Sequence, residues 1–170
     1  MELKEYIRLE LEMLDKGIKR VMDTLNQAEI AWRPACGCNS IGLIIYHLAR
    51  SNDSFIQENI LGKTELWKTG KWYQMLKLPE SEAGHSYTAE QVNAFPVPKL
   101  ENLMAYYDSV QEHTMACLRD MSPGTMDKKL SLPWFGEITV AGIFAILVGH
   151  TAQHIGEISY LRGLQHGLDK

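Results

Sequence analysis

Apolar residues recur every three or four positions in the first part of the chain, which is the spacing of one face of an α-helix. This pattern predicts a helix over residues 2–27, with an inner face of Leu3, Ile7, Leu11, Leu14, Ile18, Val21 and Leu25. The run "WRPACGCNS" then interrupts the pattern with a proline and a glycine. A second helix is expected over residues 40–60, because Asn39 or Ser40 can accept a hydrogen bond from its first N–H groups.

The middle of the chain, residues 61–97, lacks this periodicity and is expected to be a long irregular connection. Thr88 and Gln91 have the spacing of a capping box, which predicts one short helix within the connection. Connections of this length inside a compact domain are usually functional or mobile.

Two more amphipathic stretches follow. A third helix is expected from Pro98, which suits a first helical turn, to about Met121. The run "SPGTMDKKLSLPWFGE" is rich in turn residues and has room for a short extended piece. A fourth helix is expected from Thr139 to about Leu164, with Gly167 ending it.

Four long helices without convincing strands predict an all-α fold, a four-helix bundle. The length of 170 residues suits a single domain over 1–170, and 45% hydrophobic with 22% charged residues is typical of a globular protein. The long second connection favours a crossover topology. A formal charge of −4 and the lack of a basic stripe argue against nucleic acid as a partner.

The chain is expected to be cytoplasmic, with no membrane association. Its longest uncharged run, "ITVAGIFAILVGHTAQHIG", contains histidines, threonines and a glutamine, which argues against a membrane span. The start, "MELKEYIRLELEML", lacks the form of a signal peptide. Three cysteines without a secreted spacing pattern suggest a reducing compartment.

Three histidines interrupt the apolar patterns of the second and fourth helices. His150 and His154 are four residues apart, so they share one helix face, and Glu157 falls on the same face. His47 occupies a comparable place in the second helix, with Ser51 and Ser54 following it as a polar strip. Two ligands from one helix and a third from a facing helix suit a divalent metal with an open position. The other interpretation of the pair is a hydrogen-bonded core pair or a half-exposed polar patch.

Other candidate residues are interpreted as structural. His85, His113 and His166 are expected to be solvated, in a loop, on an outer helix face and in the tail. Cys36 and Cys38 are expected to be loop thiols, with metal or redox chemistry as the alternative, and Cys117 to pack in the third helix. Arg33 and Pro34 are expected to fix a turn. The aromatic residues of the connection are expected to cover the bundle rather than wall a pocket: Trp67, Trp72 and Tyr73.

The segments "WRPACGCNSIGLIIYHLARSND" and "FGEITVAGIFAILVGHTAQHIGEISYLRGL" resemble the DinB-like (DinB/YfiT) superfamily. The resemblance implies a four-helix bundle of up-down-down-up topology, often dimeric. It also implies a divalent metal, commonly nickel or zinc, held by three histidines, which correspond here to His47, His150 and His154. Glu157 stands where many relatives carry glutamine.

The family includes thiol-dependent S-transferases and isomerases that use a low-molecular-weight thiol, and metal-dependent hydrolases. The leading expectation is therefore a metal-dependent enzyme that transfers a thiol to a small electrophilic substrate. A hydrolase is the alternative, with Glu157 as the general base. A third hypothesis is a non-catalytic dimeric bundle that binds a metal or small ligand as a sensor or store.

Overall fold

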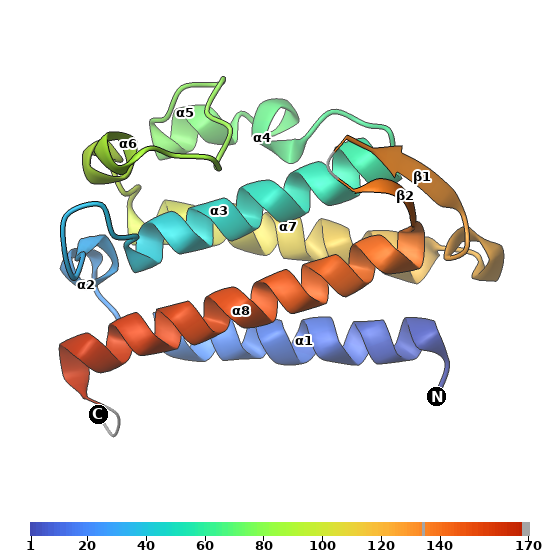
Figure 1. Cartoon of the computed structure of the whole chain (residues 1–170), viewed down its shortest axis with the longest axis horizontal. Coiled ribbons are helices and arrows are strands. Elements are labelled where there is room, and N and C mark those ends of the chain that lie inside the picture. Colours follow the sequence, from blue (N-terminus) through green and yellow to red (C-terminus); the bar gives the residue numbers. More distant parts are fainter. Residues whose placement is uncertain (134, 168–170) are drawn as a thin grey trace.

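Four long helices dominate the part of the chain that the structure describes, residues 1–133 and 135–167 of a computed structural model (Figure 1). They are α1 (Leu3–Met22), α3 (Ile41–Asp53), α7 (Leu100–Asp120) and α8 (Val140–His166). The predicted helical bundle is confirmed at this level. None of the helices in these residues has the length and apolarity that crossing a membrane requires.

The long helices are arranged as two pairs, with α1 packed on α8 and α3 packed on α7. Arg162 near the end of α8 donates to Thr24, just beyond the end of α1, so these two helices run in the same direction. Lys4 at the start of α1 donates to the main-chain oxygen of Met121, just beyond the end of α7, so α1 and α7 run in opposite directions. Figure 1 shows α3 running alongside α7 in the same direction.

The first helix is shorter than predicted. The expected range of 2–27 was wrong at its end, because α1 stops at Met22 and a separate short helix, α2 (Gln27–Ala31), follows. Asn26 starts this helix, since its side chain accepts hydrogen bonds from the N–H groups of Ala28 and Glu29. The Glu29 carboxylate accepts from the N–H of Asn26 in return. This capping box turns the chain where apolar spacing alone predicted continuation.

The second helix begins as predicted but changes type before its end. The Ser40 hydroxyl accepts from the N–H of Leu43, which confirms the expected cap. After Asp53 the chain continues as a π-helix, η1 (Ser54–Ile60), rather than as the predicted α-helix. The N–H of Leu61 donates to the carbonyl of Ile56, five residues earlier, which is the hydrogen-bond spacing of a π-helix.

The long connection contains more structure than the single helix predicted for it. Besides α6 (Ala89–Ala94), which has the expected capping box at Thr88, it contains α4 (Leu66–Thr69) and α5 (Trp72–Leu76). These helices lie over α3 in Figure 1. Trp67 is fully buried, and Trp72 and Tyr73 pack against the same core, so their predicted covering role is confirmed.

The buried carboxylate of Asp53 anchors the start of this connection to α3. It accepts hydrogen bonds from the main-chain N–H groups of Leu66 and Trp67, and from the Tyr106 hydroxyl of α7. Arg50 lies 3.8 Å away from it and forms an ion pair with Glu65 at 2.9 Å. A charge removed from water in this way needs such partners. The bonds to Leu66 and Trp67, together with the pairing of Arg50 with Glu65, fix the connection on α3.

The expectation of an all-α chain was wrong in one place. The turn-rich run contains a hairpin of two antiparallel strands, β1 (Lys129–Leu132) and β2 (Gly136–Thr139), where only a short extended piece was expected. A short 3₁₀ turn, η2 (Pro123–Thr125), precedes it. The hairpin leads directly into α8, where the Thr139 hydroxyl accepts a hydrogen bond from the N–H of Gly142 and caps the helix.

The ends of the last two long helices are close to those predicted. Pro98 lies just before α7 rather than in its first turn, since the helix begins at Leu100. The fourth helix continues to His166, two residues beyond the expected end, and stops at Gly167 with φ of +79°.

Candidate metal centre

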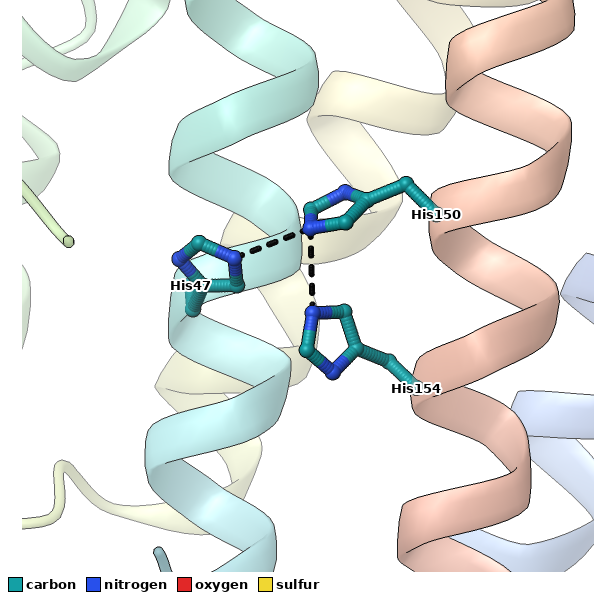
Figure 2. A group of neighbouring side chains, drawn as sticks. All are labelled: His47, His150 and His154. Atoms are coloured by element: carbon teal, nitrogen blue, oxygen red, sulfur yellow. Dashed lines mark hydrogen bonds between the residues drawn. The ribbon is translucent and has the colours of Figure 1, made fainter.

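Three imidazoles from two facing helices meet in the space between these helices (Figure 2). His47 comes from α3, and His150 and His154 come from α8. Their ring nitrogens lie within 4.8 Å of one another. The Nε2 atom of His150 is 3.0 Å from Nε2 of His47 and 3.0 Å from Nε2 of His154. The residues proposed from helical spacing are thus brought together.

The partners of the opposite ring nitrogens determine where the hydrogens lie. Nδ1 of His47 is 2.7 Å from the main-chain oxygen of Gly84, and Nδ1 of His154 is 2.7 Å from a carboxylate oxygen of Glu157. Both oxygens accept hydrogen bonds, so in the neutral rings each Nδ1 carries the hydrogen. The lone pairs of these two histidines therefore lie on the Nε2 atoms, which face His150.

The environment favours neutral imidazoles. The pKa of His150 is lowered to about 4, mainly by burial and in addition by the two neighbouring histidines. Burial also lowers the pKa of His47, although its hydrogen bond to the Gly84 carbonyl opposes the change. Neutral rings at neutral pH have the lone pairs that a metal ion requires.

The donor set fits a divalent ion better than it fits a cluster of hydrogen bonds. The Nε2 atom of His150 can carry one hydrogen, and this hydrogen can be donated to Nε2 of His47 or to Nε2 of His154 but not to both. Its Nδ1 atom is buried and has no hydrogen-bond partner among the described residues. A cation at the centre accepts all three lone pairs at once, as in three-ligand metal sites. Imidazole ligands suit zinc, nickel, copper and iron alike, so they do not select the metal.

A cavity of about 640 Å³ opens beside the three histidines, and both His47 and His150 line it. Ser51 and Ser54 line it as well, as expected for the polar strip below His47. Phe135 at the tip of the hairpin contributes an apolar wall. A smaller cavity of about 290 Å³ reaches His47 and His154 from another side. The cluster is therefore accessible to small molecules.

Glu157 lies next to the histidines but takes a different place from the one a catalytic base requires. Its carboxylate bonds to His154 on the side of the ring away from the other two histidines, and its side chain is 41% exposed. It lines neither of the two cavities described above. Its position is that of a group orienting a metal ligand.

Two features of the site were missed from the sequence. His85 is exposed, as expected for a solvated loop histidine, but it also lines both cavities together with Ser86, which was not anticipated. The Gly84 carbonyl that bonds to His47 was not anticipated, because a main-chain oxygen has no side-chain signature. Of the other histidines, His113 is exposed as expected, whereas His166 is partly buried 3.0 Å from a Glu29 oxygen.

The cysteines and Arg33 have structural positions. Cys36 is exposed and Cys38 half-buried in the loop before α3, both as free thiols, and Asn93 donates to the Cys36 sulfur. Cys117 is buried in the core, as predicted, and burial raises its pKa to about 11. Arg33 donates to the main-chain oxygen of Phe95, which supports its role in fixing the turn.

Two solved structures share this fold along nearly the whole chain. A conserved protein of Enterococcus faecalis is 19% identical with a TM-score of 0.85, and the match covers 96% of this chain and 97% of that one. YfiT from Bacillus subtilis, described as a probable metal-dependent hydrolase with an unusual four-helix bundle topology, is 17% identical with a TM-score of 0.65. That match covers 96% of this chain and 87% of YfiT.

None of the curated proteins matches the chain. The family model of the DinB superfamily, however, matches residues 11–158. This span contains all three converging histidines, the whole of the first segment that carries the resemblance, and the second segment as far as residue 158. The chain belongs to the DinB superfamily.

Proposed function

We propose that the protein is a metal-dependent enzyme in which His47, His150 and His154 hold one divalent ion. The observation that carries the proposal is the convergence of three Nε2 atoms beside a cavity large enough for a small substrate. When bound, such an ion acts as a Lewis acid that lowers the pKa of a water molecule or a thiol at its open position. Nickel and zinc are the metals to test first.

The proposed reaction is transfer of a low-molecular-weight thiol to a small electrophilic substrate. Ser51 and Ser54 offer hydroxyl groups to the substrate, and Phe135 and Ile146 offer apolar contacts. Glu157 supports transfer over hydrolysis, because its carboxylate is engaged with His154 and lines neither cavity. The structural similarity to YfiT, described as a probable metal-dependent hydrolase, supports the alternative of a hydrolase. In that case Glu157 is the candidate base.

A sensor or store without catalytic activity is a weaker interpretation. Such a site is usually closed by a fourth protein ligand. Within residues 1–133 and 135–167, the cluster contains three candidate ligands, with open cavities beside it.

We also propose that the protein works as a homodimer, which is supported by exposed apolar side chains on the paired helices α1 and α8, such as Met13 and Tyr160. Size-exclusion chromatography with light scattering tests this.

Metal content tests the site directly. Protein purified without chelator should contain about one divalent ion per chain, and His150→Ala should lose most of it, because two imidazoles hold such an ion far less tightly than three. The matched control is His113→Ala, which removes an exposed histidine of α7 and should leave the metal content unchanged. Equal metal in wild type and in the triple His47, His150, His154→Ala variant would place the ion elsewhere.

Glu157→Gln separates the two reactions, since it keeps a hydrogen-bond acceptor for His154 and removes the base. If the enzyme transfers thiols, turnover of the metal-saturated variant should stay within about tenfold of wild type. If the enzyme is a hydrolase that uses this carboxylate, turnover should fall by a factor of about 10² to 10⁴. Transferase turnover is measured with small thiols, such as cysteine and 2-mercaptoethanol, and chromogenic electrophiles. Hydrolase turnover is measured with chromogenic esters. Wild type and variant are compared at equal metal content.

A further inference from the structure

Residues 82–87, which we term the Gly84 strap, contact His47 through the main chain of Gly84. Gly84 is buried, and its main-chain oxygen is 2.7 Å from Nδ1 of His47. Residues of the strap line both cavities, so it forms a common wall between the histidine cluster and the two openings. The strap therefore joins the long connection directly to the proposed metal site.

Only glycine fits at position 84. Its φ of +82° lies in the left-handed region, which L side chains rarely adopt. A Cβ atom there would also lie 2.6 Å from Cβ and 2.7 Å from Cγ of Arg50. Arg50 has little freedom to give way, because it is buried and its guanidinium is paired with Glu65. The close approach is what brings the carbonyl within hydrogen-bonding distance of His47.

The strap is held in shape by its own hydrogen bonds. The Glu82 carboxylate accepts from the Tyr87 hydroxyl at 2.8 Å and from the N–H of Gly84 at 3.3 Å. Ser86 also has a left-handed backbone, with φ of +61°, which is costly for a residue with a side chain. Such a backbone persists only where surrounding contacts determine it.

We propose that Gly84 is a positioning residue for the metal centre. Its carbonyl holds the hydrogen of His47 on Nδ1 and fixes the ring so that Nε2 faces the other two histidines. The closed strap is then a condition for tight metal binding, and opening of the strap weakens it. This inference rests on the proposed function, because it assumes that His47 is a metal ligand. Loss of a hydrogen bond to a ligating histidine typically weakens metal binding by about 10- to 100-fold.

The test compares two glycines with similar backbones. Gly84→Ala should raise the dissociation constant for Zn²⁺ by about 10- to 100-fold, measured by competition with a chromophoric chelator. The matched control is Gly62→Ala, since Gly62 has φ of +63° but no atom within 4 Å of its would-be Cβ. Gly62→Ala also places a side chain on a left-handed backbone, but away from the cluster, and it should leave zinc affinity unchanged.

A second variant covers the case in which Gly84→Ala fails to fold. Tyr87→Phe removes only the hydroxyl that holds Glu82 and should weaken zinc binding by about threefold to tenfold. Nitrogen NMR of the metal-free protein gives a signature independent of the metal: Nδ1 of His47 carries the hydrogen in wild type, and a mixture of tautomers should replace this form in the variants.

The outcomes separate the two proposals. If wild type binds no metal at the histidines, the proposed function fails, and the inference fails with it. If wild type binds zinc and the folded Gly84→Ala protein binds it equally well, the positioning role alone is wrong. If Gly84→Ala does not fold, the Tyr87→Phe variant decides. An unchanged zinc affinity and an unchanged His47 tautomer in that variant would also show that the positioning role is wrong.

Discussion

Acidification should destabilise the metal-free protein through His150. The pKa of this histidine is about 4 in the folded chain, because burial and two neighbouring imidazoles disfavour its charged form, against an ordinary value of 6.5. A folded pKa below the unfolded one means that the unfolded chain takes up the proton first. The stabilising contribution is therefore complete above about pH 6.5 and is lost as the pH falls toward 4.

The size of the effect follows from this difference. Between about pH 8 and pH 5, His150 alone should reduce the free energy of unfolding by about 2 kcal/mol. The pKa of His47 is also lowered, so His47 acts in the same direction. The metal-loaded protein should lose stability more steeply, because protons compete with the metal for the same lone pairs.

Urea unfolding measures the effect, with fluorescence as the probe, since Trp67 is fully buried in the native state. Metal is removed from the protein by dialysis, and the metal-free protein is then unfolded with urea at several pH values. His150→Asn is unfolded in parallel, because the difference between the two proteins cancels the contributions of unrelated carboxyl groups. If both proteins lose the same stability within about 0.5 kcal/mol, the burial argument for His150 is refuted.

Three further predictions concern the scaffold. Asp53→Ala should lower the free energy of unfolding by about 3–5 kcal/mol in urea titrations. The change leaves two main-chain N–H groups and a tyrosine hydroxyl without their buried acceptor, and it removes a negative charge 3.8 Å from Arg50. A loss below about 1 kcal/mol would contradict this prediction. Gly42→Ala should cost about 1–3 kcal/mol, because a Cβ there would overlap the Val97 side chain, and adding Val97→Ala should recover part of the loss. Changing both Cys36 and Cys38 to serine should leave metal content and melting temperature nearly unchanged, and loss of the metal would identify them as ligands.

The histidine cluster could be predicted from sequence because it depends on helical periodicity alone. His150 and His154 share a face wherever the segment is helical, and His47 faces them once the second helix packs against the fourth. The same reasoning placed the polar strip of Ser51 and Ser54 toward the cavity. Short-range rules also worked where a cap determined the structure, as at Ser40.

Periodicity failed where local hydrogen bonds or distant contacts decided the structure. The first helix ends early because of a capping box at Asn26, within a stretch of favourable spacing. The hairpin before α8 is too short for an alternating pattern to be distinguished from a loop. The contact of Gly84 with His47 joins residues 37 positions apart through a main-chain atom, so no local pattern indicates it.

The two pairs of helices give the proposed ion a topological role. His47 belongs to the α3–α7 pair and His150 to the α1–α8 pair, and 103 positions separate them along the chain. An ion held by both acts as a removable cross-link between distant parts of the chain, and it stabilises the folded protein because the separated histidines of an unfolded chain do not bind it as a set. Because the ligands meet only after the pairs have docked, loading is a late event in folding. Metal exchange should then report on the separation of the two pairs, and hydrogen exchange along the α3–α8 contact should slow when the ion binds.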